Sequence, residues 1–260
     1  MSHCCCALSV KTLDIASGTY TTLWTLAKSQ WGITAINAND ISPIDLKAYG
    51  VVKIDSMRYL ARFDEANIEY LGFIANSNLN AGVFDNDGDF FAREGKRMHK
   101  IKRPDLLQGY TTHSSATADF SAVWMTWTQD PNCNDYASLN YDLTGTGSKQ
   151  KWLVGLGAGS QAKLNLINTE CECRYLLDVS GYVPSSSSFG AAWTYIDGEN
   201  IEHVYFASND ASVGIFELVA SSVDIQALTC EVKRLGIPTA NTANNDGMSC
   251  RSLLTTPFPM

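Results

Sequence analysis

The sequence predicts an all-β fold, and more specifically a β-propeller of about six blades, with five or seven blades left open. Three observations lead to this prediction. Short runs rich in β-branched and aromatic residues recur along the chain, each bounded by Gly, Asn, Asp, Ser or Pro. Few stretches keep the 3.6-residue period of an amphipathic helix over a dozen residues. A degenerate repeat of about 40 residues, the length of one propeller blade, runs through the first half.

The expected strands follow one another closely from the N-terminal region to about residue 219. Residues 40–47 could hold one helical turn, and the serine-rich stretch 184–188 is interpreted as a flexible connector. The runs expected to form strands are residues 19–26, 48–54, 59–63, 68–74, 89–92, 121–128, 152–156, 203–207 and 214–219.

The repeat consists of a first strand of small apolar residues, a polar turn, a second strand, and a third strand that carries a charged residue. Small residues on the first strand would let several sheets crowd round one axis, and aromatic residues on the outer strands would fill the space between blades. The first strands are expected at 36–38, 80–84, 120–124 and 190–193. The second strands are expected at 49–51, 89–92, 136–139 and 204–207, and the third at 60–64, 98–101, 139–143 and 214–218.

Two further parts of the chain complete the predicted ring. One more blade must fit between residues 142 and 190, with 161–166 and 175–179 as its strands. Residues 11–23 are interpreted as the third and fourth strands of a blade whose first two strands come from 190–207 or from nearby C-terminal sequence. Such a closure would hide open sheet edges. Residues 1–260 are therefore predicted to be one propeller domain, with N- and C-terminal strands closing the ring and an irregular tail at 236–260.

Several short motifs occur in a fixed order along the chain. Residues 13–19 are similar to a D-x-x-T/S-G-x blade turn, segments 36–38, 49–51, 81–89, 190–193 and 204–209 follow, and residues 245–250 read N-D-G-M-S-C. Together they resemble an uncharacterised propeller-like domain of large extracellular and cell-surface proteins of bacteria, fungi and protists, which closes on N-D-G-x-x-C. The resemblance covers nearly the whole chain. It implies an extracellular adhesive or structural module and no known reaction.

Charge and hydropathy exclude some classes of partner. The net charge is −8, whereas a protein that binds a nucleic-acid backbone needs a basic face. No run of 18 apolar residues occurs, so we expect no membrane insertion. The first six residues lack the basic start and apolar stretch of a signal peptide. We expect an extracellular or cell-surface location, with the start of the sequence being a processed or engineered end.

The cysteines favour disulfide or structural use over metal binding. Their even number is typical of disulfides in an extracellular setting. The Cys171-Glu172-Cys173 spacing does not match a C-x-x-C zinc knuckle, and no paired motif follows it. The pairing stays open among Cys4, Cys5, Cys6, Cys133, Cys171, Cys173, Cys230 and Cys250.

One acidic cluster is a candidate calcium site. Asp85, Asp87 and Asp89 place three carboxylates at alternate positions beside Gly88, and oxygen ligands of this kind hold calcium. The EF-hand pattern needs a glutamate further along than Glu94. An Asn-Asp-Gly run is also a common hairpin turn, which is the favoured alternative. No other cofactor is expected.

No catalytic residues are predicted. The four histidines are far apart, and Ser160 is displaced from the G-x-S-x-G pattern of a hydrolase. The glycines at 155–159 lack a following helix and are interpreted as a loop. The basic run 93–103 is interpreted as a solvated hairpin, with docking to an acidic partner as the alternative. The tryptophans in apolar runs are expected to pack between blades.

The sequence therefore favours a non-catalytic extracellular structural or adhesive module that assembles with other proteins or with copies of itself. A glycan-binding propeller is the first alternative, because its tryptophans could stack on sugars. A hydrolase or lyase on the same scaffold is the second alternative, and it would need acids and a histidine that converge at the axis.

Overall fold

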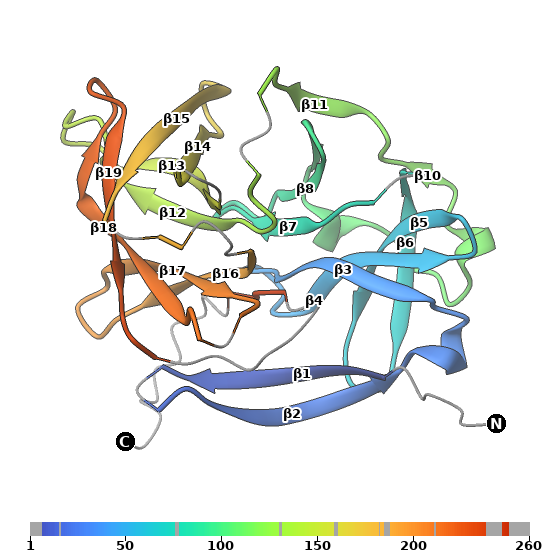
Figure 1. Ribbon diagram of the computed structural model, residues 1–260. Coiled ribbons are helices and arrows are strands. Elements are labelled where there is room, and N and C mark those ends of the chain that lie inside the picture. The colour runs from blue at the N-terminus through green and yellow to red at the C-terminus, as the bar shows by residue number, and fades with distance from the viewer. Residues whose placement is uncertain are drawn as a thin grey trace.

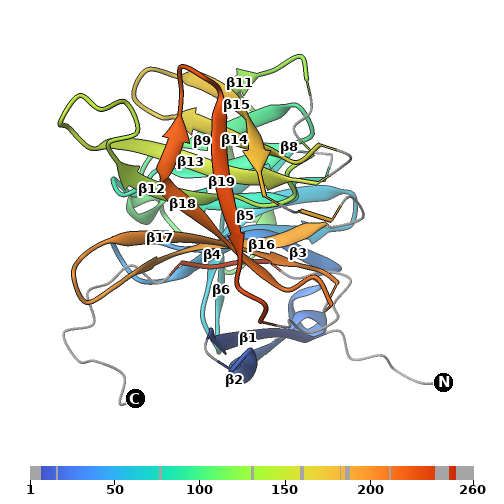
Figure 2. The ribbon, with the colours of Figure 1, turned by 60° about the vertical axis from the view of Figure 1, so that its left-hand side comes forward.

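The computed structural model describes residues 7–15, 17–75, 78–129, 132–158, 161–181, 183–184, 188–210, 212–237 and 246–249. These residues confirm the all-β class: they form nineteen strands and three short 3₁₀ helices. In Figure 1 groups of strands follow one another in chain order around a common centre. Figure 2 shows the same arrangement from another side, with the hairpin of β1 and β2 below the other units.

Four of the units in the described part of the chain are antiparallel meanders of four strands. The first is β3 (Ala35–Ile41), β4 (Ala48–Ile54), β5 (Met57–Phe63) and β6 (Ile68–Ala75). The second is β7 (Ala81–Phe84), β8 (Phe90–Glu94), β9 (Arg97–Ile101) and β11 (Val123–Thr126). The third is β12 (Ala137–Tyr141), β13 (Gln150–Gly157), β14 (Lys163–Asn168) and β15 (Cys173–Ser180). The fourth is β16 (Phe189–Ile196), β17 (Glu202–Ser208), β18 (Ile215–Asp224) and β19 (Thr229–Arg234).

The remaining elements join or cover these meanders. β1 (Ala7–Asp14) and β2 (Thr19–Ala27) form a two-stranded antiparallel hairpin, the fifth unit. β10 (Ala118–Asp119) adds a parallel strand to β6. The outer strands β15 and β19 also pair in parallel, so the third and fourth meanders form one eight-stranded sheet. The 3₁₀ helices are η1 (Lys28–Trp31), η2 (Pro104–Leu106) and η3 (His113–Ser115).

The turns after several first strands are held by a carboxylate. Asp85 follows β7, Asp142 follows β12 and Asp197 follows β16, and each accepts hydrogen bonds from backbone N–H groups two to four residues further on. Because such a side chain replaces the missing ladder partner, it lets the chain reverse tightly. The polar turns expected after 80–84 and 190–193 are therefore present, and a local hydrogen-bonding reason accounts for them.

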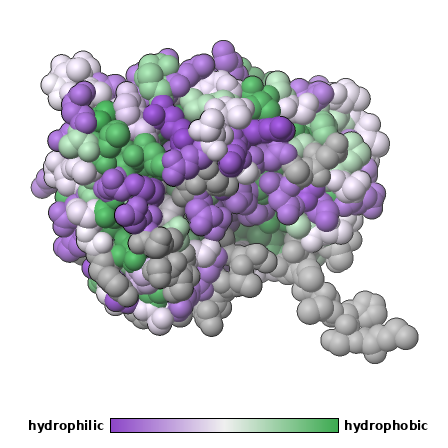
Figure 3. Space-filling view, turned by 45° about the horizontal axis from the view of Figure 1, so that its top comes forward, coloured by the Kyte–Doolittle hydropathy of each residue, from purple (hydrophilic) through white to green (hydrophobic). Residues whose placement is uncertain are grey.

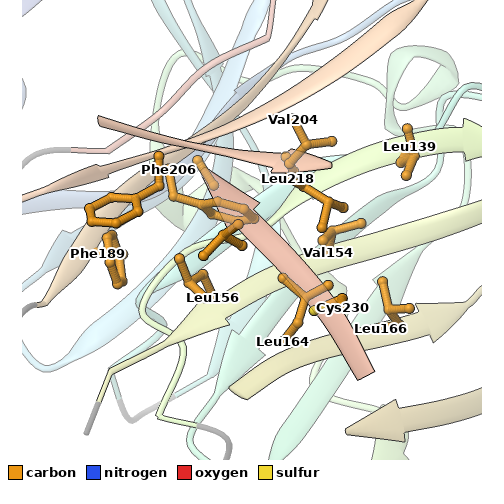
Figure 4. Close-up of a cluster of buried hydrophobic side chains, with 14 of the residues drawn as sticks. Leu139, Val154, Leu156, Leu164, Leu166, Phe189, Val204, Phe206, Leu218 and Cys230 are labelled. Carbon is orange, nitrogen blue, oxygen red and sulfur yellow. The ribbon is translucent and has the colours of Figure 1, made fainter. Parts of the chain in front are cut away.

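The apolar cores lie between units, and they link all five into a closed series. The first meander packs on the second through Tyr49 and Phe84, and the second on the third through Phe91 and Tyr136. The third packs on the fourth in the cluster that Figure 4 draws, with Leu156 on one side and Phe206 on the other. The labelled side chains of this cluster are Leu139, Val154, Leu156, Leu164, Leu166, Phe189, Val204, Phe206, Leu218 and Cys230.

The hairpin completes the series. Leu13 packs on the cluster of Tyr205 in the fourth meander, and Leu26 belongs to the cluster of Phe63 in the first. Every unit therefore buries apolar side chains against both of its neighbours. A two-stranded hairpin is marginally stable alone, so this double packing is what holds it.

The first strands lie closest to the centre, and small residues allow it. β3 lies against β7, β7 against β12, and β12 against β16. A Cβ atom at Gly82 of β7 would lie 2.1 Å from the backbone oxygen of Ala38 in β3. The expectation that small residues let the first strands crowd together holds at this contact.

Two expectations for the middle of the chain are wrong. Segment 120–124 does not begin a unit, because β11 pairs with β9 as the last strand of the second meander. Residues 137–141 form one first strand, β12, where a second and a third strand were expected. The connection from β9 to β11 contains η2, η3 and β10, and this insertion shifts the following unit along the chain.

The strands expected for an additional blade belong to this third meander. Residues 163–168 and 173–180 are its third and fourth strands, β14 and β15. The hairpin of β1 and β2 does not receive its missing strands from 190–207 either, since β16 and β17 pair with each other and β17 with β18. Residues 246–249 from the tail lie at the centre instead, without strand hydrogen bonding.

Candidate functional site

The three predicted calcium ligands occupy the turn between β7 and β8. Asp85 Oδ1 accepts hydrogen bonds from the N–H groups of Asp87 and Asp89, each at 3.0 Å. Asp87 Oδ2 lies 2.5 Å from Lys151 Nζ, and Asp89 Oδ2 lies 3.1 Å from Lys100 Nζ. These contacts are those of a hairpin turn. Among the described residues no three His, Cys, Asp or Glu side chains are arranged to hold a metal ion, and calcium here stays a prediction.

The described histidines do not converge on one site. His99 on β9 is buried between Glu94 and the carbonyl of Ala122. His113 packs against the rings of Tyr59 and Tyr70. His203 lies on β17 in a different meander, and His3 lies outside the described residues.

The basic run 93–103 is exposed at its tip and at Lys102, and several of its other residues are buried. Gly95, Lys96 and Arg97 are exposed, whereas Arg93 and His99 are each 2% exposed. Lys100 Nζ lies over the rings of Phe91 and Trp124, at 5.1 and 5.7 Å from their centroids. The interpretation of the whole run as a solvated hairpin is therefore wrong for Arg93 and His99. Arg93 donates a hydrogen bond to the carbonyl of Cys133, which precedes the third meander, and His99 contacts Glu94 and Ala122.

A set of three aspartates lies where the first strands meet, and only one of them, Asp246, stands in a motif noted in the sequence. Asp40 at the end of β3 is 2% exposed. Its Oδ1 accepts the N–H groups of Ile41 at 2.9 Å and Ser249 at 2.7 Å. Its Oδ2 accepts the N–H of Phe84 in the second meander at 2.8 Å. One carboxylate thus links β3, β7 and the tail by hydrogen bonds.

Asp135, just before β12, likewise accepts hydrogen bonds from several segments of the chain, here from the fourth meander and the tail. It is 2% exposed, and its Oδ1 accepts the N–H of Tyr136. Its Oδ2 accepts the N–H of Ala192 in the fourth meander at 2.6 Å and that of Gly247 at 3.1 Å. Burial, followed by the nearby charge of Asp246, raises the pKa of Asp135 well above its ordinary value.

The third member is Asp246, which belongs to the tail motif 245–250. Its Oδ2 accepts both the backbone N–H of Asn39 at 2.9 Å and the Asn39 side-chain amide at 2.8 Å. Burial raises the pKa of Asp246 to about 8, and the charge of Asp40 acts in the same direction. We call Asp40, Asp135 and Asp246 the central aspartates.

The central aspartates are structural in their chemistry. Asp40 and Asp135 use both oxygens to accept backbone N–H groups, so neither offers a free oxygen to a substrate. A carboxylate that accepts several N–H groups satisfies donors that burial would otherwise leave unpaired. The only sequence signal for them was the N-D-G-x-x-C tail, since Asp40 and Asp135 stand in no recognised motif.

A second cluster lies on the sheet face of the fourth meander that the hairpin of β1 and β2 covers only in part. Trp193 and Tyr205 are stacked across β16 and β17, with ring centroids 5.6 Å apart. The ring of His203 lies nearly parallel to Tyr205. Tyr195 is 49% exposed beside His203. The rings form a continuous aromatic face of Trp193, Tyr195, His203 and Tyr205.

Two carboxylates flank the aromatic face. His203 Nδ1 lies 2.8 Å from Glu217 on β18, and its Nε2 lies 3.1 Å from Asp197. Burial disfavours a charged ring, but the hydrogen bonds to Asp197 and Glu217 outweigh it and raise the pKa of His203. Stacking surfaces beside hydrogen-bonding groups suit a ligand with apolar faces and hydroxyl edges.

The cysteines described by the structure are paired locally or buried. Cys171 and Cys173 form a disulfide at the start of β15. Cys133 and Cys230 are buried, and burial raises the pKa of Cys230 to about 12. Cys4, Cys5, Cys6 and Cys250 lie outside the described residues.

No family model matches this sequence, and a comparison with curated proteins finds no match either. Among solved structures, a DUF4784 family protein from Bacteroides caccae aligns with a TM-score of 0.44 and 8% identity, over 86% of this chain and 73% of that chain. NanB with Optactamide aligns with a TM-score of 0.36 and 12% identity, over 66% of this chain and 26% of that chain. In the described residues no helix is long and apolar enough to cross a membrane.

Proposed function

We propose that this protein is a non-catalytic extracellular module that mediates protein–protein assembly at a cell surface or in an extracellular filament. Its scaffold in this proposal is a five-bladed β-propeller. The four meanders are four blades, and the N-terminal hairpin with residues 246–249 is the fifth.

The closed series of cores supports the propeller. Each unit packs on two neighbours, first strands lie at the centre, and glycine at Gly82 permits close approach. Radially repeated small sheets that share apolar faces are the architecture of a propeller. Joining both chain ends in one blade would leave no unit without a neighbour.

The non-catalytic assignment rests on one observation: the oxygens of Asp40 and Asp135 accept hydrogen bonds from the protein's own backbone. A hydrolase on this scaffold needs acids with free oxygens and a histidine nearby. Here the carboxylate oxygens of Asp40 and Asp135 accept hydrogen bonds from backbone N–H groups. His99 and His203 lie in other parts of the fold.

The fifth unit supports the assembly proposal, because its sheet has only two strands, β1 and β2, among the described residues. Among the described residues, β1 and β2 pair only with each other, so their outer edges are open. Leu23 on β2 is 59% exposed. An open strand edge beside an exposed apolar side chain is a common template for pairing with another chain. On the face drawn in Figure 3, hydrophilic and hydrophobic residues are interspersed.

The experiment is sedimentation velocity over a hundredfold range of concentration, with electron microscopy of the concentrated sample. We expect concentration-dependent association that Leu23→Lys weakens. Leu106→Lys is the matched control, because Leu106 is also exposed, at 74%, but lies in η2 away from the hairpin. A chain that stays monomeric at every concentration, alone and in contact with other surface proteins, contradicts the proposal.

Glycan binding is a second candidate, and the aromatic face favours it. Sugars stack on aromatic rings and hydrogen-bond to flanking carboxylates. On a glycan array we expect Tyr195→Ala to weaken any specific signal by about five- to tenfold, since one stacking contact is worth about 1 kcal/mol. Leu106→Ala should leave the signal unchanged. An array without hits for the unchanged protein removes this candidate.

A further inference from the structure

We propose that residues 246–249 form a proton-controlled latch, in which a neutral Asp246 carboxyl donates a hydrogen bond to the Asp135 carboxylate and so holds the tail at the centre of the ring. Loss of this proton places two like charges in contact and loosens the tail. This inference does not depend on what the module binds.

The tail is docked by side-chain and backbone hydrogen bonds to first strands on two sides. The hydrogen bonds described for residues 246–249 go to Asn39 and Asp40 at β3, to Asp135 before β12, and to Thr194 on β16, whose N–H donates to Ser249 Oγ at 2.9 Å. Docking is close, because a Cβ atom at Gly247 would lie 2.1 Å from the carbonyl oxygen of Ala192. The segment therefore bridges the fourth meander and the first.

The hydrogen-bond pattern decides which aspartate carries the proton. Asp40 and Asp135 each accept three backbone N–H groups spread over both oxygens. Such bonds favour the ionised form, and at Asp135 they oppose the rise in pKa that burial causes. Asp246 accepts donors at Oδ2 only. Its Oδ1 is buried and accepts no hydrogen bond. This carboxyl is also in hydrogen-bond contact with that of Asp135. A proton on Asp246 Oδ1 satisfies both groups at once.

The charged groups that act on Asp246 are all acidic. The charge of Asp40 on β3 disfavours a negative charge on Asp246, and the charge of Asp246 in turn raises the pKa of Asp135 before β12. β16 meets the segment with Ala192 and Thr194, which do not titrate in this range. Burial and like charge therefore act together, as they do in other carboxyl pairs that share a proton.

The direction of the pH effect follows from these contacts. The pKa of Asp246 is about 8 in the folded protein, against an ordinary value of 3.8. Between these values the docked tail binds a proton that the undocked tail has lost. Docking is therefore strongest below about pH 4, weakens as pH rises, and reaches its weakest level above about pH 8.

The experiment measures hydrogen–deuterium exchange of the whole chain between pH 5 and pH 9, reported as protection factors of the peptide that contains Gly247 to Ser249. We expect the protection factor of this peptide to fall between pH 5 and 7.5. The fall should be at most about tenfold per pH unit, because an equilibrium that releases one proton cannot change faster with pH. A peptide from β14 should keep its protection over the same range.

Two substitutions with opposite expected effects make the test sharp. Asp246→Asn keeps an acceptor for Asn39 and places an N–H₂ donor against Asp135, so it mimics the protonated carboxyl. We expect it to be better protected than the unchanged protein at pH 8 and to lose the pH dependence. Asp135→Asn removes acceptor capacity for three N–H groups, and we expect lower protection at every pH.

Asp210→Asn is the control, because Asp210 caps an exposed turn, where hydrogen bonds from Ser212 lower its pKa. This variant should keep the pH dependence of the unchanged protein. If Asp246→Asn is no better protected at pH 8, or if it keeps that dependence, the latch is overturned. If Asp246→Asn fails to fold, a tail in the unchanged protein whose protection does not vary with pH overturns it equally.

Discussion

At the scale of single residues, the fold depends on a few positions where the backbones of neighbouring units touch. Gly82 lies against Ala38, and Gly247 lies against Ala192, each at a distance that leaves no space for a methyl group. The central aspartates then connect the same strands by hydrogen bonds to backbone N–H groups. At the centre, glycine and the central aspartates therefore act on the same first strands.

Gly82→Ala should destabilise the protein by about 2–3 kcal/mol or more, since the new methyl group meets backbone that cannot move away. Chemical unfolding monitored by circular dichroism measures this effect. Gly198→Ala is the matched control, because a Cβ atom there meets no atom within 4 Å. Equal stability of the two variants would mean that β3 and β7 do not approach as closely as described.

At the scale of elements, the turns of a meander are formed by residues close in sequence. The tail instead contacts residues that are distant in sequence. Aspartate-capped turns bound strands within a meander, and strands such as β6 are buried at most of their positions. Residues 246–249 form no ladder, yet they provide hydrogen-bond partners for Asn39, Asp40, Asp135 and Thr194. Without the tail these buried groups lose partners, and a buried unpaired polar group costs about 1–3 kcal/mol.

A chain that ends at residue 245 should therefore be less stable than a chain that ends at residue 249, by several kcal/mol. The two truncations differ only in the four docked residues, so the comparison isolates their contribution. Thermal unfolding of both at pH 6 measures it. Identical melting temperatures would show that the contacts of the tail at the centre add nothing to stability.

At the scale of the whole molecule, the five units depend on one another. Each core cluster is built from two units, so no meander contains a complete core of its own. The hairpin of β1 and β2 joins the first and last meanders through Leu26 and Leu13. Closure of this kind distributes stability around the molecule and does not concentrate it in one sheet.

Unfolding should therefore be a single cooperative transition despite the separate sheets. We expect denaturant curves recorded by tryptophan fluorescence and by far-ultraviolet circular dichroism to coincide. Trp24 in the hairpin region and Trp152 in the third meander report on distant units. Two resolved transitions would show that some units fold independently of the ring.

The sequence alone determined the β class, most strand positions and the small residues of the first strands, because these follow from residue type, period and turn chemistry. It misplaced the third unit, since the insertion between β9 and β11 breaks the 40-residue spacing without a local signal. Only the tertiary structure decided the number of units, the burial of Arg93 and His99 in the basic run, and the role of Asp40, Asp135 and Asp246. An aspartate that caps a turn and an aspartate that joins two sheets are identical in sequence. They differ only in which distant N–H groups the folded chain brings to their oxygens.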